Sequence, residues 1–303
     1  MISSWLSRLI AVLGRRRGRL ITGLVYTFGP GVFTRRFYLE QGRSVRGRLG
    51  EGPGILNLSF DVDYPEDVEA LGVLCDILAE LGLVASFAVI GKWVEKYPLE
   101  HRLLVEAGHE ILNHTYSHPD HDLLHPREPF DSLSFHEQKE QIKRCHQVCT
   151  DVLGVSPAGF RAPHFGNVTG GNFYGALMEV GYRFSSSVIS VDGPEFGLPF
   201  AAAHGIWEFP VSCCPRHPFT ALDTWHALRK KRARHSAPGQ FAALISEAAA
   251  LVSSNSGYLN LYLDPRDVVE YAEARRGLER LKPGPGVPSQ LTYAQLMEQL
   301  AES

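Results

Sequence analysis

The chain has 303 residues, of which 44% are apolar and 21% are charged. These proportions are those of a folded protein, and they exclude a disordered chain, a collagen-like repeat and a small disulfide scaffold. The charge is unevenly distributed: residues 1–50 hold ten Arg, no Lys and one acid, a net +9, whereas residues 51–303 carry a net −12. We therefore expect a basic N-terminal extension, residues 1–50, ahead of an acidic folded domain, residues 51–303.

The extension contains two apolar stretches, Trp5 to Leu13 and Leu20 to Phe33, separated by three consecutive arginines. Both are shorter than the roughly twenty apolar residues of a membrane-spanning helix, and the first lacks the basic start of a signal peptide. Apolar side chains beside arginines favour an anchor on an anionic membrane surface. A disordered basic leader and a nucleic-acid arm are the alternatives, but we expect no nucleic-acid partner because the domain is acidic and has no reader motif.

The five cysteines favour a reducing compartment. Their number is odd, and Cys213 and Cys214 are adjacent, which does not suit a framework of disulfides. Because we find no export signal either, we expect a cytoplasmic location, or a peripheral one on the cytoplasmic face of the inner membrane.

From residue 54 onward, segments typical of strands alternate with segments typical of helices. The expected strands are Ile55–Phe60, Leu83–Ile90, Glu110–Asn113, Ala158–Arg161, Tyr182–Val188, Ile206–Val211 and Tyr258–Leu263. The expected helices are Pro65–Leu81, Pro98–Ala107, Phe135–Leu153, Asn172–Val180, Gln240–Ser253, Asp267–Ala274 and Thr292–Ala301. About seven such units indicate an α/β fold with a parallel sheet closed, or nearly closed, into a barrel. An open doubly wound sheet is the alternative, but no GxGxxG follows the first strand.

Residues able to do chemistry lie where strands end, which is the reaction face of a βα barrel. Asp61 and Asp63 flank Val62, so in extended chain both carboxylates point the same way. Two close carboxylates fit one metal ligand beside one general base. His114 and His118 are four residues apart and converge on one ion if the segment turns helically; two imidazoles and a carboxylate suit Zn²⁺ with positions open for water and substrate. Arg161 follows a third strand and is suited to orient a carboxylate.

Taken together, these segments resemble the polysaccharide deacetylase family (carbohydrate esterase family 4, the NodB homology fold). The resemblance covers about residues 54 to 300. The matching segments are Ser59–Asp63, His114–His118, Phe160–Pro163, Gly181–Ser187 and Glu208–Pro210.

The resemblance implies a distorted (β/α)7 barrel that removes an acyl group from a sugar with a divalent metal, Zn²⁺ being the expected ion. It implies that Asp63, His114 and His118 hold the metal and that Asp61 is the general base that accepts a proton from the attacking water. Arg161 would tether Asp61, and a backbone N–H near His164 would help to stabilise the oxyanion.

The sequence departs from the family in the part of the site that protonates the leaving amine. The family places a general-acid His after an apolar strand, where this sequence has Asp264. An Asp with an ordinary pKa near about 4 is a poor acid at pH 7. Asp264 would therefore act only if burial raised its pKa, or His164, His204 or His217 would act in its place.

A second departure concerns the support of Arg161. The Tyr-Asp-Ser pattern usual near residue 185 reads Phe184-Ser185-Ser186, so the Asp that supports the Arg or the acid is missing.

We expect a metal-dependent hydrolase that removes an N-acetyl or N-formyl group from a carbohydrate. The alternative, motivated by Asp264, is a metal-binding protein of the same fold with little activity that binds glycan or scaffolds an envelope assembly. The basic N-terminal extension further leads us to expect a lipid-linked sugar, presented at an anionic membrane surface, as the substrate.

Overall fold

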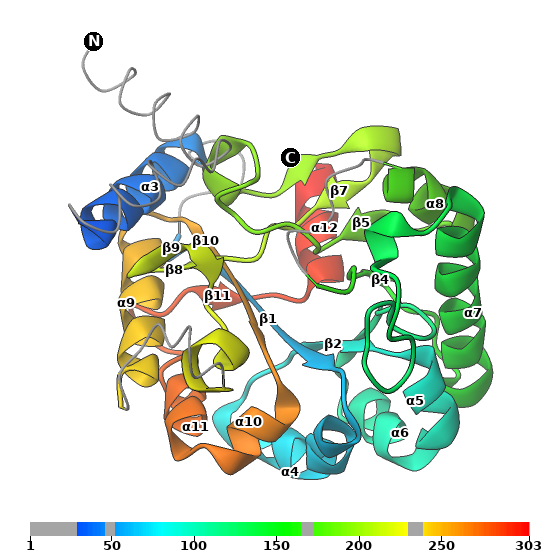
Figure 1. Cartoon of the computed structure of the whole chain (residues 1–303). Helices are drawn as coiled ribbons and strands as arrows, with labels where there is room; N and C mark the ends of the chain where they lie inside the picture. Colours follow the sequence, from blue (N-terminus) through cyan, green and yellow to red (C-terminus); the bar gives the residue numbers. More distant parts are fainter. Residues whose placement is uncertain (1–28, 46–51, 165–171, 230–238, 303) are drawn as a thin grey trace.

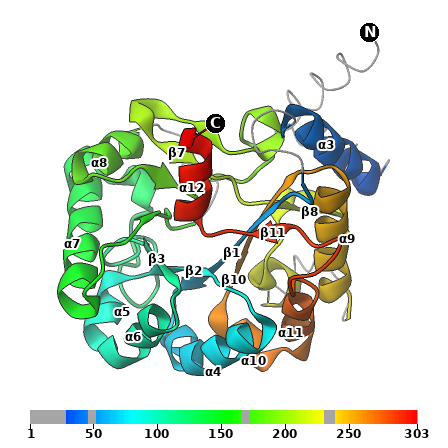
Figure 2. The same ribbon diagram turned by 180° about the vertical axis from the view of Figure 1, so that it is seen from behind.

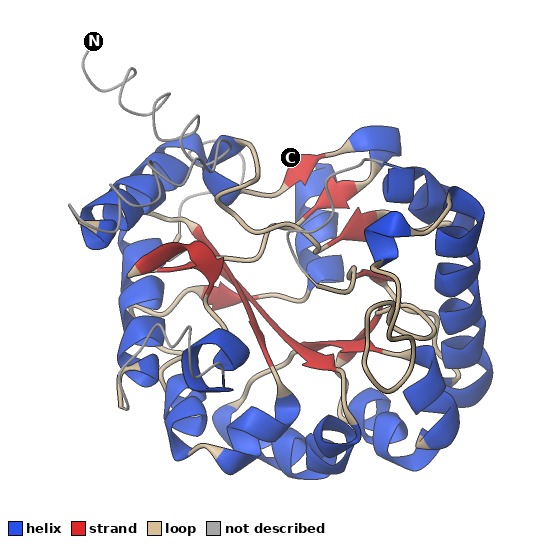
Figure 3. Ribbon diagram, in the orientation of Figure 1, coloured by secondary structure: helices blue, strands red, loops and turns tan. Residues whose placement is uncertain are grey.

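The structure is a computed structural model of the chain, described for residues 29–45, 52–164, 172–229 and 239–302. Its principal strands are β1 (Ile55–Val62), β2 (Ser86–Val89), β3 (Glu110–Asn113), β4 (Gly159–Phe160), β5 (Phe184–Ser185), β7 (Trp207–Glu208) and β10 (Tyr258–Leu263). These seven run parallel in the order β10-β1-β2-β3-β4-β5-β7 and form a curled sheet with helices around it (Figures 1 and 3). The shorter strands are β6 (Phe200–Ala201), antiparallel to β7, β11 (Ser289–Gln290), parallel to β1, and the hairpin β8 (Cys213–Cys214) and β9 (His217–Ala221).

The two ends of the curled sheet meet through the backbone just beyond β7. The Ser212 N–H donates to the carbonyl oxygen of Asn260 in β10 (2.8 Å), and the Asn260 N–H donates to Ser212 Oγ (2.9 Å). The predicted distorted seven-stranded barrel is therefore confirmed. Strands β4, β5 and β7 are shorter than predicted because only two residues of each lie in a regular ladder.

The helices pack on the outside of the sheet, except α12, which lies across the barrel on the side seen in Figure 2. They are α4 (Pro65–Leu81), α5 (Gly91–Lys96), α6 (Pro98–Glu106), α7 (Phe135–Leu153), α8 (Asn172–Val180), α9 (Phe241–Ser254), α10 (Pro265–Glu270), α11 (Ala272–Glu279) and α12 (Tyr293–Glu302). The single helix predicted over Asp267–Ala274 is wrong: Tyr271 adopts an extended conformation (φ −108°, ψ 106°) and divides the segment into α10 and α11.

Strands β1 and β10 alternate between apolar and polar side chains, and this alternation makes the barrel interior polar. The residues directed outward join the main apolar core beneath the helices: Leu56, Leu58, Phe60, Leu259, Leu261 and Leu263. The residues directed inward form hydrogen bonds with one another, with Arg161 or with Tyr293: Asn57, Ser59, Asp61, Tyr258 and Asn260. The same alternation therefore brings Asp61 and Asp63 to one site at the end of β1.

Part of the basic extension is a helix that packs against the domain. Helix α3 (Pro30–Val45) buries Tyr38, whose hydroxyl donates to the Cys213 carbonyl (3.3 Å), and Gln41, whose Oε1 accepts from the Tyr258 N–H (2.9 Å). Gly42 faces the backbone carbonyl of Asn255 so closely that a side chain would not fit. The predicted anchor lies mostly in residues 1–28, outside the described residues, and no described helix is long and apolar enough to span a membrane.

Candidate metal centre and active site

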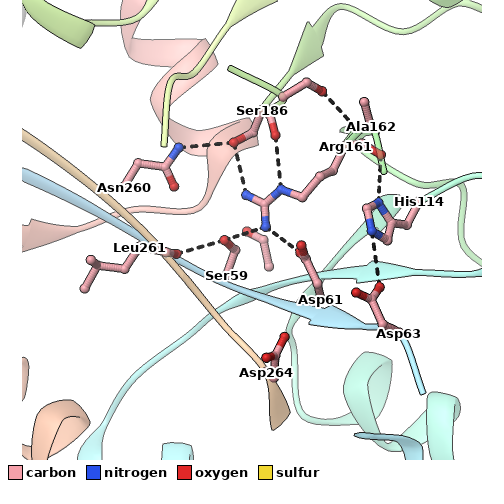
Figure 4. A network of polar contacts seen from close by, with 12 residues as sticks. Ser59, Asp61, Asp63, His114, Arg161, Ala162, Ser186, Asn260, Leu261 and Asp264 are labelled. Carbon is pink, nitrogen blue, oxygen red and sulfur yellow. Dashed lines mark hydrogen bonds and ion pairs between the residues drawn. The ribbon is translucent and has the colours of Figure 1, made fainter. Parts of the chain in front are cut away.

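Five of the predicted residues line one pocket at the carboxyl ends of the strands. The pocket has a volume of about 410 Å³, and its walls include Asp61 near the end of β1, Asp63 just after it, His114 after β3, His164 after β4 and Asp264 after β10. Because parallel strands end at one edge of the barrel, residues up to 200 positions apart in the sequence meet there. Figure 4 shows Asp61 and Asp63 on the same side of β1, with Asp264 at the end of the neighbouring strand.

Asp63, His114 and His118 bring three ligand atoms within 4.8 Å of one another. The Oδ1 atom of Asp63 lies 3.3 Å from His114 Nε2 and 3.6 Å from His118 Nε2, and this buried oxygen accepts no well-formed hydrogen bond. Two ligands held about 2.1 Å from a tetrahedral ion lie roughly 3.4 Å apart. The separations and the unpartnered oxygen therefore fit a Zn²⁺-like ion.

A kinked loop, rather than a helical turn, brings the two histidines together. Thr115 and His118 have positive φ angles of 66° and 48°. Side chains hold the kinks: the Thr115 N–H donates to Asn113 Oδ1 (2.9 Å), and the His118 N–H donates to Thr115 Oγ1 (3.0 Å). The convergence predicted from the spacing is thus present, but its cause is a strained, hydrogen-bonded loop.

Two further contacts orient the ligands. The Nδ1 of His114 contacts the carbonyl oxygen of Arg161 (2.8 Å), so Nδ1 carries the proton and Nε2 turns its lone pair toward Asp63. The carbonyl of Asp63 accepts hydrogen bonds from Trp93 Nε1 (2.7 Å) and from His121 Nε2 (2.9 Å). His121 is buried, and its contact with the Asp63 carbonyl supports the candidate metal site.

Arg161 is fully buried and holds Asp61. Its Nη1 donates to Asp61 Oδ1 (2.7 Å) and to Ser59 Oγ (2.8 Å). Its Nε donates to the Ser186 carbonyl (3.1 Å), and its Nη2 donates to Ser186 Oγ (3.0 Å) and Tyr293 OH (2.7 Å). The departure at residues 184–186 therefore leaves Arg161 supported, because Ser186, labelled in Figure 4, and Tyr293 both supply acceptors.

Burial and neighbouring charges shift the pKa values of Asp61 and Asp63 in opposite directions. Burial raises the pKa of Asp61, although Arg161 opposes the shift. Burial acts in the same direction on Asp63, but His118 and His114 outweigh it and hold the pKa of Asp63 below its usual range. Burial lowers the pKa of His118, which favours the neutral ring that binds metals. The pKa values of the two carboxylates are thus shifted in opposite directions, upward for Asp61 and downward for Asp63.

Asp264 and His164 occupy different positions in the pocket. Burial, together with neighbouring carboxylates, raises the pKa of Asp264 well above its usual range, so its carboxyl meets one condition for an acid. Its Oδ2, however, is enclosed and has no hydrogen-bond partner. His164 is exposed and has a positive φ of 55°. Its predicted role as a backbone oxyanion donor remains a prediction.

Several residues that shape the site carry no sequence signal of their own. Tyr293 lies at the start of α12, 132 residues after Arg161, and its hydroxyl also donates to Asn260 Oδ1 (2.6 Å). His226 lines the pocket and pairs with Asp223, but neither belongs to a motif considered from the sequence. The alternation of polar and apolar residues along β10 is the sequence signal that would place Asn260 in the barrel interior.

Comparison with known proteins agrees with this architecture. Residues 50–183 match a family model described as polysaccharide deacetylase. A chitooligosaccharide deacetylase of Bradyrhizobium sp. is 37% identical over 123 residues, which is 40% of this chain and 52% of that protein. One of Sinorhizobium fredii is 44% identical over 73 residues, 24% of this chain and 33% of that protein. The chain thus spans about a third to a half of the length of these relatives.

A crystal structure from Mycobacterium smegmatis, described as a polysaccharide deacetylase, matches the fold with a TM-score of 0.68 at 19% identity. The alignment covers 84% of this chain and 92% of that one. At this identity the similarity establishes the fold alone.

Proposed function

We propose that the chain, whose residues 50–183 match the polysaccharide deacetylase family model, is a metal-dependent hydrolase that removes an N-acetyl or N-formyl group from a carbohydrate. One observation carries the proposal. Asp61 and Asp63 end the same strand in one pocket, where Arg161 holds the first and two histidine nitrogens face the second. Neighbouring carboxylates in such different environments suit a general base beside a metal ligand.

The residues present divide the reaction between them. Asp63, His114 and His118 would hold a divalent cation, for which Zn²⁺ is the best candidate given two imidazoles and one carboxylate. When bound, such an ion acidifies water and withdraws electrons from an amide carbonyl. Asp61 accepts the proton of the attacking water through its raised basicity, and Arg161 fixes its orientation. The backbone N–H of His164 is the proposed further donor to the oxyanion.

We further propose a lipid-linked sugar as the natural substrate, presented at an anionic membrane surface on the cytoplasmic side. Helix α3 supports this extension of the proposal because it joins the basic leader to the pocket wall. The ring of Phe33 on α3 packs at a tilt against Phe219 (5.7 Å between ring centroids), and Phe219 lines the pocket. The leader, residues 1–28, adds five Arg and no acid immediately before this helix.

A second candidate function follows from Asp264, which stands where the family has its acid. The protein would then bind metal and glycan with little turnover. Assays of purified protein, loaded with Zn²⁺, on N-acetylated and N-formylated amino sugars distinguish the two. Release of acetate or formate supports the hydrolase; stoichiometric Zn²⁺ without release on any of these sugars contradicts it.

A further inference from the structure

We propose that His226, oriented by Asp223, is the proton donor to the leaving amine in this protein. The inference rests on the proposed function and names the residue that takes the place of the family's missing histidine. His226 lies in the π-helical turn Trp225–Arg229, beyond the segment that matches the family model. Its side chain lines the same pocket as Asp61 and Asp63.

The pair has the geometry of an oriented imidazole. His226 Nδ1 lies 2.6 Å from Asp223 Oδ2, and the His226 backbone N–H donates to Asp223 Oδ1 (2.6 Å). Asp223 is buried, whereas the His226 side chain is 26% exposed. The Asp223 carboxylate holds the proton on Nδ1, so the donor is the imidazolium form of the ring, whose Nε2 proton lies on the opposite side. Trp225 packs edge-on against the ring (4.9 Å between centroids).

Two connections hold this turn against the end of β10, where the family's histidine would be. The Asp264 N–H donates to Oγ1 of Thr224, the residue after Asp223 (3.0 Å). Arg229, at the end of the turn, pairs with Asp267 and with Glu270 (2.9 Å) on α10. Asp264 therefore stands where the family has its histidine, and the imidazole of His226, from a different segment, lies in the same pocket.

His226 is better placed for the reaction than Asp264. Both residues line the pocket, but the Oδ2 of Asp264 is buried without a hydrogen-bond partner, whereas the His226 side chain is 26% exposed and can contact both substrate and solvent. In the step proposed, the C–N bond breaks, its electron pair moves to nitrogen, and that nitrogen takes the proton from His226 Nε2 as the carbonyl re-forms. The proton that Asp61 accepted from water then returns to His226 through solvent, so the cycle closes without a further reactant.

The test compares two leaving groups, because an amine needs a proton to depart and 4-nitrophenolate does not. Wild type and variants, all loaded with Zn²⁺, are assayed on an N-acetyl chito-oligosaccharide and on 4-nitrophenyl acetate. We expect His226→Gln to lose about 10²-fold or more in kcat on the amide and to change little on the ester. Asp223→Asn, which keeps the ring, should show a smaller loss of the same kind, and the exposed His136→Gln should change neither rate.

Equal losses on both substrates, or no loss on the amide, would overturn the assignment of His226. A selective amide loss in Asp264→Asn but not in His226→Gln would assign the proton to Asp264 and overturn it as well. Failure of the proposed function has a separate signature: the wild type, with Zn²⁺ bound, would then release acetate from no acylated sugar, and the inference would fall with it.

Discussion

His114 and Asp61 are held by the same residue: the Arg161 carbonyl contacts His114 Nδ1 (2.8 Å), and the Arg161 guanidinium donates to Asp61 Oδ1 (2.7 Å). The proposed metal ligand His114 and the proposed base Asp61 therefore share one buried support. Any movement of Arg161 displaces both, so the two parts of the site keep a fixed relative position. The ion pair with Asp61 and the hydrogen bonds to Ser59, Ser186 and Tyr293 offset the free-energy cost of burying the Arg161 charge.

Substitutions of Asp61 and Asp63 should have different effects on turnover and on metal binding. Asp61→Asn is expected to reduce turnover roughly 10²–10⁴-fold, the usual contribution of a general base, with Zn²⁺ still bound. Asp63→Asn should lose Zn²⁺ itself, because it removes the anionic ligand. Metal content after dialysis and acetate release measure the two effects. Loss of metal in both variants, or in neither, would contradict the assigned roles.

Arg161→Met should destabilise the fold strongly. Removing one partner of a buried ion pair costs about 3–5 kcal/mol because the other charge is left uncompensated. The free energy of unfolding in urea measures the loss. The matched control is Arg275→Met, since Arg275 forms an exposed pair with Glu80 (3.1 Å) and should cost at most about 1 kcal/mol. Similar losses in the two variants would show that Arg161 is not the support described.

The stability of the metal-free protein should fall in mild acid through His101, which lies on α6. Burial lowers the pKa of His101 to about 4, below the value near 6.5 expected in the unfolded chain. As the pH falls from about 6.5 toward 4, the unfolded state takes up a proton that the folded state does not. The stability present above the unfolded pKa is therefore lost progressively over this window.

At about 1.36 kcal/mol per pKa unit, His101 alone accounts for at most about 3 kcal/mol of this loss. His101→Gln should flatten the dependence on pH, as followed by urea denaturation between pH 7 and pH 4.5. An unchanged slope in the variant would mean that His101 is protonated in the folded state. His136→Gln, an exposed substitution on α7, serves as the matched control.

Deletion of residues 1–28 should abolish binding to anionic vesicles without affecting the fold. Cutting at residue 28 spares α3, which buries Tyr38 and Gln41 in the domain. The five arginines removed each contribute about 1 kcal/mol near an anionic surface, and the binding should weaken with salt. Sedimentation with vesicles containing phosphatidylserine measures the effect, and vesicles of phosphatidylcholine alone are the control. Unchanged sedimentation of the shortened chain would refute the anchor.

The sequence predicted those parts of the molecule that depend on local patterns. The ends of β3, α7, α8 and β10 follow from hydrophobic periodicity and from glycines that end helices. The positions of Asp61, Asp63, His114 and His118 follow from their places after strands. Two extended residues of one strand share a face, and in a barrel the carboxyl ends of the parallel strands meet at one edge.

The remainder depended on tertiary contacts that no local pattern records. Tyr293 on α12 and Ser186 both accept hydrogen bonds from Arg161. Neither residue lies at a sequence distance from Arg161 that a local pattern would indicate. Asp223 and His226 belong to no sequence motif. They come to the pocket because the turn containing them is hydrogen-bonded to the end of β10. Likewise, α3 was assigned to the basic extension because residues 1–50 hold ten Arg and one acid, whereas its buried side chains pack against the domain.

The most direct test of the central claim is acetate release from an N-acetyl chito-oligosaccharide, followed as Zn²⁺ is titrated into chelator-treated protein. The account predicts no turnover in the stripped protein. It further predicts that activity rises in proportion to bound Zn²⁺ up to one ion per chain, and that Asp61→Asn binds the same ion without turnover. Release that is independent of bound metal, or full occupancy by Zn²⁺ without release from this substrate or its N-formyl counterpart, would contradict it.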